Sequence, residues 1–213
     1  MSYKAVIFDL DGTILDTLQD LTDALNYAMT EFGYPHRTME DVRNFIGNGA
    51  RRLIALSVPE GADVDAVLAV YKTYYDAHCQ IKTRPYAGIP EALETLGKKY
   101  PMAVVSNKPD SAVKPLCAQY FPDLFARGES ADCPRKPAPD MLFQTMKAIG
   151  VDTCVYVGDS EVDVITAKAA GVPCLSVLWG FRDREEIEAM GGQHFCTHTS
   201  QLVEKLEEII NGQ

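Results

Sequence analysis

Long apolar runs are missing from this sequence of 213 residues. The longest, Val172–Phe181, is far shorter than the ~20 residues of a membrane-spanning helix, and Pro173 and Gly180 interrupt it. The first residues lead directly to Asp9, without the apolar stretch and the small-residue cleavage site of a signal peptide. We therefore expect no membrane partner and a cytoplasmic location.

Basic residues are few relative to acidic ones. The chain has 20 Lys and Arg against 30 Asp and Glu, so its formal net charge is -10 and its pI is about 4.8. This charge repels nucleic acids and anionic membrane surfaces, so we expect neither as a partner. The 46% of hydrophobic residues is enough to build a core and excludes a disordered chain. The length suits one medium domain with an insert, or two small domains.

Paired cysteines at metal-binding spacing are also missing. The six cysteines include no C-x-x-C, and we interpret them as reduced core residues. One dense patch, His194–His198, contains two His and one Cys, but no second cluster completes a tetrahedral metal site. We interpret this patch as a terminal strand and loop.

Short β-rich apolar runs alternate with amphipathic stretches along most of the chain. The expected strands are residues 4–8, 102–106, 154–158 and 174–178, and each is too apolar to have a solvated face. Apolar residues are spaced as in helices over residues 111–120, 139–149, 162–170 and 200–210. This alternation predicts an α/β fold with a doubly wound, mostly parallel sheet and helices on both faces.

Residues 16–83 break this alternation. Their segments 18–32, 39–46, 50–56 and 64–81 all have helical spacing, and none is a convincing strand. We interpret them as an inserted all-helical cap domain that leaves the sheet after its first strand. Proline and glycine in Arg84–Gly88 mark the return of the chain to the sheet. We expect an α/β core of residues 1–15 and 84–213 and a helical cap of residues 16–83.

Two pairs of acidic residues follow expected strands. Asp9 and Asp11 come directly after the first strand, where ligands of open α/β sheets bind, and Gly12 permits a tight turn. Asp159 and Asp163 lie one helical turn apart after a later strand. Carboxylates so close together repel unless a cation or a shared proton offsets the cost. Oxygen ligands without a nearby His or Cys favour Mg²⁺.

Two further segments offer groups suited to an anion. Ser106 and Asn107 supply a hydroxyl and an amide at the end of a strand, and Lys136 supplies a positive charge ahead of a helix. Each segment alone is also typical of an ordinary turn. Lys108 is a weaker candidate, because a lysine beside a proline in a loop is usually solvated.

Four short motifs now stand in a defined order along the chain. D-L-D-G-T, a strand ending in Ser-Asn, K-P-x-P and G-D-S-x-x-x-D resemble the motifs of the haloacid dehalogenase superfamily of phosphotransferases. The resemblance spans essentially the whole chain, and the insert falls where one class of these enzymes carries its cap. Phe45–Arg51, Ser106–Pro109 and Trp179–Phe181 are similar to segments of the phosphoglycolate phosphatases.

The resemblance implies a role for each motif residue. Asp9 would attack phosphorus and form an aspartyl-phosphate, and Asp11 would protonate the leaving oxygen and later activate water. Mg²⁺ would be held by the Asp9 carboxylate, the Asp11 backbone carbonyl and Asp159, with Asp163 binding it directly or supporting a ligand. The residues expected to bind the phosphoryl group are Gly12, Thr13, Ser106, Asn107 and Lys136, of which Lys136 also counts as catalytic.

The resemblance favours a phosphatase acting on a small-molecule phosphate ester, with 2-phosphoglycolate as the first candidate. The residues of the insert expected to set specificity are Gly47, Asn48, Gly49, Arg51 and Arg52. Their Gly-x-Gly turn can bring backbone close to a ligand, and one arginine could pair with a substrate carboxylate, although both could equally begin a solvated helix.

Several other functions stay open on the same scaffold. They are a sugar phosphomutase like β-phosphoglucomutase and an inorganic pyrophosphatase. A phosphonate hydrolase fits less well because its pattern replaces Asp11 and uses a cap lysine, where this chain has Arg51 and Arg52. A catalytically silent binding module is disfavoured because every motif residue is present. Both a monomer and a homodimer are compatible with the sequence.

Overall fold

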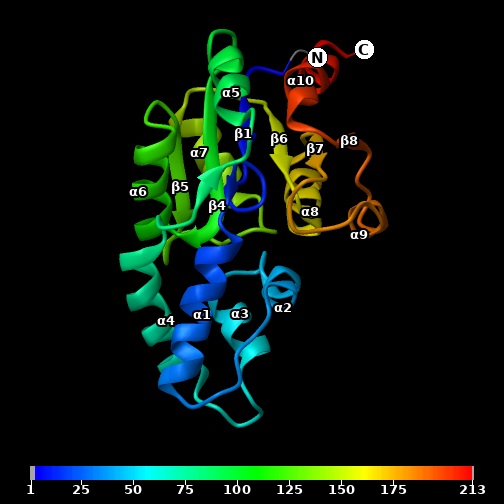
Figure 1. Cartoon of the computed structure of the whole chain (residues 1–213). Helices are drawn as coiled ribbons and strands as arrows, with labels where there is room; N and C mark the ends of the chain where they lie inside the picture. Colours follow the sequence, from blue (N-terminus) through cyan, green and yellow to red (C-terminus); the bar gives the residue numbers. More distant parts are fainter. Residues whose placement is uncertain (1–2, 213) are drawn as a thin grey trace. The chain divides into compact units, whose positions relative to one another are not determined.

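The computed structural model describes residues 3–212, which divide into two compact units (Figure 1). One unit holds residues up to Leu15 and from Pro85 onward, and the other holds Asp16–Arg84. The chain passes between them at strands β2 (Leu15–Asp16) and β3 (Arg84–Pro85), which pair as a two-stranded sheet. Within the described residues, no helix combines the length and the apolar character needed to cross a membrane.

The first unit is built on a six-stranded sheet in the order β5-β4-β1-β6-β7-β8. The strands are β1 (Val6–Phe8), β4 (Met102–Pro109), β5 (Phe125–Glu129), β6 (Val155–Gly158), β7 (Cys174–Val177) and β8 (His194–Cys196). Every neighbouring pair is parallel. The chain builds outward from β1 to β5 and then returns to place β6 on the other side of β1. This reversal is the topological switch point, where open α/β sheets bind ligands.

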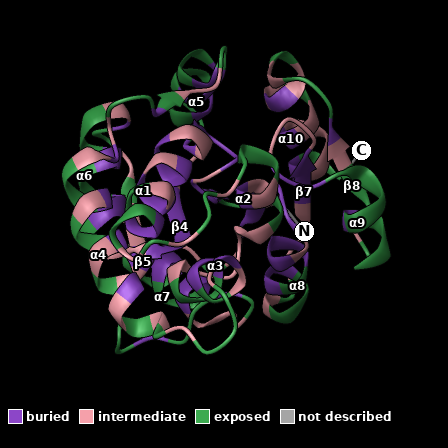
Figure 2. Cartoon of the chain, turned by 60° about the horizontal axis from the view of Figure 1, so that its bottom comes forward, coloured by how far each residue is buried: buried purple, intermediate pink, exposed green. Residues whose placement is uncertain are grey.

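Helices cover both faces of this sheet. They are α5 (Ile89–Gly97), α6 (Asp110–Tyr120), α7 (Asp140–Ala148), α8 (Glu161–Ala170), α9 (Arg184–Ala189) and α10 (Leu202–Asn211), with a short 3₁₀ helix at Thr199–Gln201. Ile7 and Tyr156 join one apolar cluster with Met141 of α7. Val6 and Phe8 alternate with Ile7 and are equally buried, so the opposite face is covered too. Figure 2 shows β4 and β7 mostly in the colour of buried residues. The predicted doubly wound α/β fold is therefore confirmed.

The second unit consists of four helices: α1 (Leu18–Glu31), α2 (Met39–Phe45), α3 (Ala50–Ser57) and α4 (Val64–His78). Thr38 and Asp41 form a capping box at the start of α2, and the Asp63 carboxylate caps α4. Helices α1 and α4 pack against each other. Gly47 and Gly49 have φ angles of 113° and 80° between α2 and α3, a conformation that favours glycine.

Candidate active site

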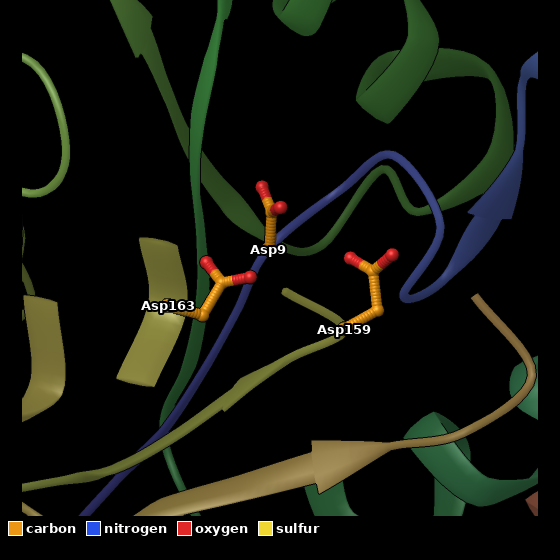
Figure 3. Close-up of side chains that lie close together, drawn as sticks. All are labelled: Asp9, Asp159 and Asp163. Atoms are coloured by element: carbon orange, nitrogen blue, oxygen red, sulfur yellow. The ribbon is translucent and has the colours of Figure 1, made fainter. Parts of the chain in front are cut away.

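Three carboxylates meet at the switch point of the sheet. Asp9 follows β1, Asp159 follows β6, and Asp163 lies in the first turn of α8. Strands β1 and β6 are parallel neighbours in register from Val6 to Phe8, so their carboxyl ends deliver Asp9 and Asp159 to the same place. The ligand atoms of the three residues all lie within 4.8 Å of one another (Figure 3). No other such group of three or more is found in residues 3–212.

Burial makes this cluster electrostatically unfavourable. The pKa of Asp9 is raised to about 7, mainly by burial and further by the charges of Asp163 and Asp11, although Lys136 opposes the shift. Burial, followed by the charges of Asp163 and Asp9, also raises the pKa of Asp159 well above its usual range. A cation bound among these oxygens would relieve the repulsion.

Lys136 supplies one positive charge to this cluster. Its Nζ lies 2.9 Å from Asp9 Oδ1, 2.8 Å from Asp163 Oδ1 and 3.0 Å from the Tyr156 hydroxyl. Burial alone would lower the pKa of Lys136, but the charges of Asp163 and Asp9 outweigh it and raise that pKa well above its ordinary value. Lys136 is therefore a permanent cation against Asp9.

Asp159 is held by the loop that follows β1 and by the loop that follows β7. Its Oδ1 accepts a hydrogen bond from Thr13 Oγ1 at 3.1 Å, and its Oδ2 accepts one from the Phe181 backbone N–H at 2.7 Å. Gly12 has a φ of 78°, and a Cβ there would stand 2.3 Å from Asp159 Oδ2. Gly12 and Thr13 thus shape the pocket of Asp159, and a larger residue at position 12 would displace that carboxylate.

Asp163 is engaged by protein groups at both oxygens. Oδ1 contacts Lys136 and accepts a hydrogen bond from the Tyr156 hydroxyl at 3.2 Å. Oδ2 accepts hydrogen bonds from the Ser160 backbone N–H at 3.1 Å and from Ser160 Oγ at 2.7 Å. This carboxylate therefore caps α8 and holds Lys136 at the same time.

Ser106 and Asn107 lie near the end of β4, and both are buried. The Asn107 amide donates to the Lys136 carbonyl at 2.9 Å and accepts from the Lys136 N–H at 2.8 Å. Ser106 Oγ accepts a hydrogen bond from the Lys108 N–H at 3.2 Å. The Asn107 side chain is thus a two-point clamp on the backbone of Lys136, which the sequence did not indicate.

Lys108 is not solvated, and the expectation from the sequence is wrong at this position. Its Nζ lies 2.6 Å from Asp11 Oδ1, and its side chain is only 3% exposed, against 13% for that of Asp11. A Lys-Pro pair is typical of a loop, but here β4 continues to Pro109 and includes Lys108. Tyr156 was missed because a tyrosine in a buried strand is typical of a core residue.

The candidate specificity residues lie in the second unit. Gly47, Asn48 and Gly49 form the connection between α2 and α3. Arg51 and Arg52 begin α3 and are both exposed. The Arg51 guanidinium is engaged by Asp65, with Nε 3.0 Å from Oδ1 and Nη2 3.1 Å from Oδ2.

Comparison with known proteins supports the same family. Residues 6–177 match the haloacid dehalogenase-like hydrolases. A phosphoglycolate phosphatase of Pseudomonas putida is 36% identical over 87% of this chain and 73% of its own length, and one of Mesorhizobium japonicum is 32% identical over 97% of both. A crystal structure from Lactobacillus delbrueckii subsp. bulgaricus superimposes with a TM-score of 0.90 at 41% identity, covering 97% of this chain and 99% of the other. The chain belongs to the haloacid dehalogenase-like hydrolases.

Proposed function

We propose that this hydrolase removes the phosphoryl group from a small phosphorylated metabolite through an aspartyl-phosphate on Asp9. Phosphoglycolate phosphatases match most of this chain, and this similarity supports the reaction class, which is hydrolysis of a phosphoric monoester. The observation that carries the proposal is the buried Asp9 carboxylate at the switch point, 2.9 Å from the Lys136 ammonium. A phosphate dianion can approach an anionic nucleophile only where positive charge offsets the repulsion.

The donor set fits a magnesium ion. It consists of carboxylate oxygens with no His or Cys among them, and burial and mutual repulsion disfavour the charges of Asp9 and Asp159, which a bound cation would offset. We propose that the Asp9 and Asp159 carboxylates and the Asp11 backbone carbonyl hold Mg²⁺. Asp163 would then act as a supporting residue, because both of its oxygens already contact Lys136, Tyr156 or Ser160. Bound Mg²⁺ would neutralise charge on the phosphoryl oxygens.

The first chemical step forms the phosphoenzyme. A carboxylate oxygen of Asp9 attacks phosphorus, and the bond from phosphorus to the ester oxygen breaks with its electron pair going to that oxygen. Asp11 donates its proton to the departing oxygen, which leaves as an alcohol. Lys136 stabilises the charge of the transferring group, together with the backbone near Gly12 and Thr13 and the groups at Ser106 and Asn107.

The second step returns the enzyme to its starting state. Asp11, now a carboxylate, accepts a proton from a water molecule whose oxygen attacks phosphorus. The bond between phosphorus and Asp9 breaks, and its electron pair restores the Asp9 carboxylate. The products are inorganic phosphate and a protonated Asp11, so both aspartates are ready for another turnover.

The favoured substrate is 2-phosphoglycolate, on the strength of the relatives' activity and of the two arginines at the start of α3. Arg51 is already paired with Asp65, so Arg52 is the better candidate to meet a substrate carboxylate. We also propose that residues 16–83 form the cap that this family carries between its first two motifs.

A panel of phosphorylated metabolites, read by phosphate release with and without Mg²⁺, tests this function. We expect Mg²⁺-dependent hydrolysis, with 2-phosphoglycolate preferred over hexose phosphates. The matched control is Asp9→Asn, which is nearly isosteric but a poor nucleophile and should retain under about a thousandth of the activity, within the range of catalytic losses. Conversion of β-glucose-1-phosphate to glucose-6-phosphate would favour the mutase, and preference for pyrophosphate would favour the pyrophosphatase.

A further inference from the structure

We propose that Lys108 is a positioning residue that fixes the direction of the Asp11 carboxyl group for proton transfer to the leaving oxygen. This inference rests on the proposed function, because it assigns Lys108 a part in the same reaction. The observation is the contact of 2.6 Å between Lys108 Nζ and Asp11 Oδ1, between side chains that are 3% and 13% exposed. A hydrogen bond of this length in a water-poor setting holds its two partners in one geometry, and because Lys108 engages Oδ1, the proton of Asp11 is left to Oδ2.

The backbone of Lys108 is itself fixed. Lys108 lies near the end of β4, where the pairing with β5 shifts register between Val105 and Pro109, and its N–H donates to Ser106 Oγ. The buried side chain therefore reaches Asp11 from a segment of β4 whose backbone is held by the Ser106 hydroxyl. Asp11 lies in the turn after β1, where its backbone forms a bridge to Leu15. A side chain in a turn has freedom that a rigid neighbour can remove, and proton transfer depends strongly on such geometry.

The two buried lysines of the site, Lys136 and Lys108, contact different aspartates. Lys136 contacts Asp9 and Asp163, so the nucleophile already has its cation. Lys108 contacts Asp11, the residue assigned to proton transfer. A lysine whose role was only to attract phosphate would affect all phosphate esters alike. A lysine that orients the proton donor matters most where the leaving oxygen needs a proton most.

Substituted phenyl phosphates separate these roles. The quantity to measure is kcat/KM, which reports formation of the phosphoenzyme. Lys108→Met should lower kcat/KM for unsubstituted phenyl phosphate by about 10- to 100-fold. This loss is a part of the ~10² to 10⁴-fold that acid–base catalysis contributes. The value for p-nitrophenyl phosphate should fall less than about threefold, because p-nitrophenolate leaves without a proton. The dependence on leaving-group pKa should therefore become steeper, as it should in Asp11→Asn.

Two controls guard against a general loss of structure. Lys114→Met removes another lysine ion pair of this unit, with Asp110, where the lysine side chain is 65% exposed, and it should leave the whole series unchanged. Lys108→Gln keeps a hydrogen-bond donor in place of the ammonium and should recover part of the loss on phenyl phosphate. The double variant Asp11→Asn/Lys108→Met should be no slower on phenyl phosphate than Asp11→Asn alone, since Lys108 acts through Asp11.

The outcomes that overturn the proposal are distinct from those that overturn the function. A uniform loss across the series in both Lys108 variants would make Lys108 a phosphate-binding or structural residue. Losses that multiply in the double variant would show that Lys108 acts independently of Asp11. No loss in Lys108→Met would remove any role. If the wild type hydrolyses neither these esters nor any metabolite of the panel with Mg²⁺ present, the proposed function itself fails.

Discussion

The surroundings of Asp9 disfavour the negative charge of its carboxylate. Its pKa is raised to about 7 because burial disfavours the carboxylate and because Asp163 and Asp11 repel it, despite the contact with Lys136. In the unfolded chain the pKa of this group returns to about 3.8. The folded state therefore binds more protons than the unfolded state between these two values, so this group stabilises the fold fully below pH 3.8 and loses that contribution as the pH rises through about 7.

We expect the metal-free protein to show this effect in its free energy of unfolding. Relative to Asp9→Asn, the wild type should lose stability between pH 5 and pH 8, because the asparagine variant has no proton to release. Urea unfolding in the presence of EDTA at several pH values measures the difference. If the free energy of unfolding of the wild type minus that of Asp9→Asn stays constant over this range, or increases as the pH rises, a raised pKa is contradicted.

The sequence predicted some residues of the site because their chemistry and position agree. Asp9 and Asp159 follow apolar strands, and paired acids at strand ends indicate a ligand site. Lys108 and Tyr156 gave no such signal, since one stands beside a proline and the other in an apolar strand. Only the register of β1, β4 and β6 brings their polar ends to the aspartates.

The helix start of α1 and the end of the insert are tied together by one buried side chain. The Asp20 carboxylate is in the first turn of α1 and is 4% exposed. It accepts hydrogen bonds from the N–H of Lys82 at 2.9 Å, the N–H of Thr83 at 2.8 Å and Thr83 Oγ1 at 2.9 Å. Thr83 immediately precedes β3, so Asp20 anchors the segment through which the chain leaves the insert.

Asp20→Ala should destabilise the second unit by about 2 to 4 kcal/mol, because it leaves buried N–H groups without their acceptor. Hydrogen exchange of the Lys82 and Thr83 amides should become faster by a corresponding factor. The matched control is Asp23→Ala on the same helix. The ion pair between Asp23 and Lys82 is partly exposed, so losing it should lower the free energy of unfolding by under about 1 kcal/mol. Equal effects of the two substitutions would show that Asp20 is not an anchor.

At the level of elements, periodicity predicted the pieces that bury a regular apolar face. The four helices of the insert and strands β1, β4, β6 and β7 were expected within a few residues of their bounds. Strand β5 was not expected, because its sequence Phe-Ala-Arg-Gly-Glu is polar and lies at the edge of the sheet. Helix α5 was also not expected, although Gly88 and Pro90 mark its start. Helix α9 was not expected either, because its six residues are too few to show a helical spacing of apolar residues.

Over the whole chain, the order of the motifs carries more information than any single motif. Each motif follows a strand or precedes a helix, and a doubly wound sheet brings strand ends that are distant in sequence to one edge. Phe8 and Val157 are paired in the sheet although 149 positions separate them, and that pairing unites the first and last motifs. Spacing alone could not predict which side chains would hold one another inside this site.

Because the net charge is -10 and three carboxylates are buried together, we expect the stability of the protein to depend on cations. An ion that binds only the folded state stabilises it by about 2.7 kcal/mol at a concentration of 100 times its Kd. For a chain of this size each kcal/mol shifts Tm by about 2 to 4 °C. We therefore expect saturating Mg²⁺ to raise the Tm of the metal-free protein by roughly 5 to 10 °C, measured by calorimetry or circular dichroism.

Asp159→Asn separates a specific site from general screening of the negative surface. This variant removes one buried repulsive charge, so its Tm without Mg²⁺ should equal or exceed that of the wild type, since the pKa of Asp159 is raised. With Mg²⁺, the Tm of Asp159→Asn should rise only as much as it does with sodium chloride of equal ionic strength. Sodium chloride should raise the Tm of both proteins slightly, because screening acts on the whole surface. A full Mg²⁺ response in Asp159→Asn would place the ion elsewhere on the molecule. A wild-type response no larger than that to sodium chloride would leave the three aspartates without a bound metal.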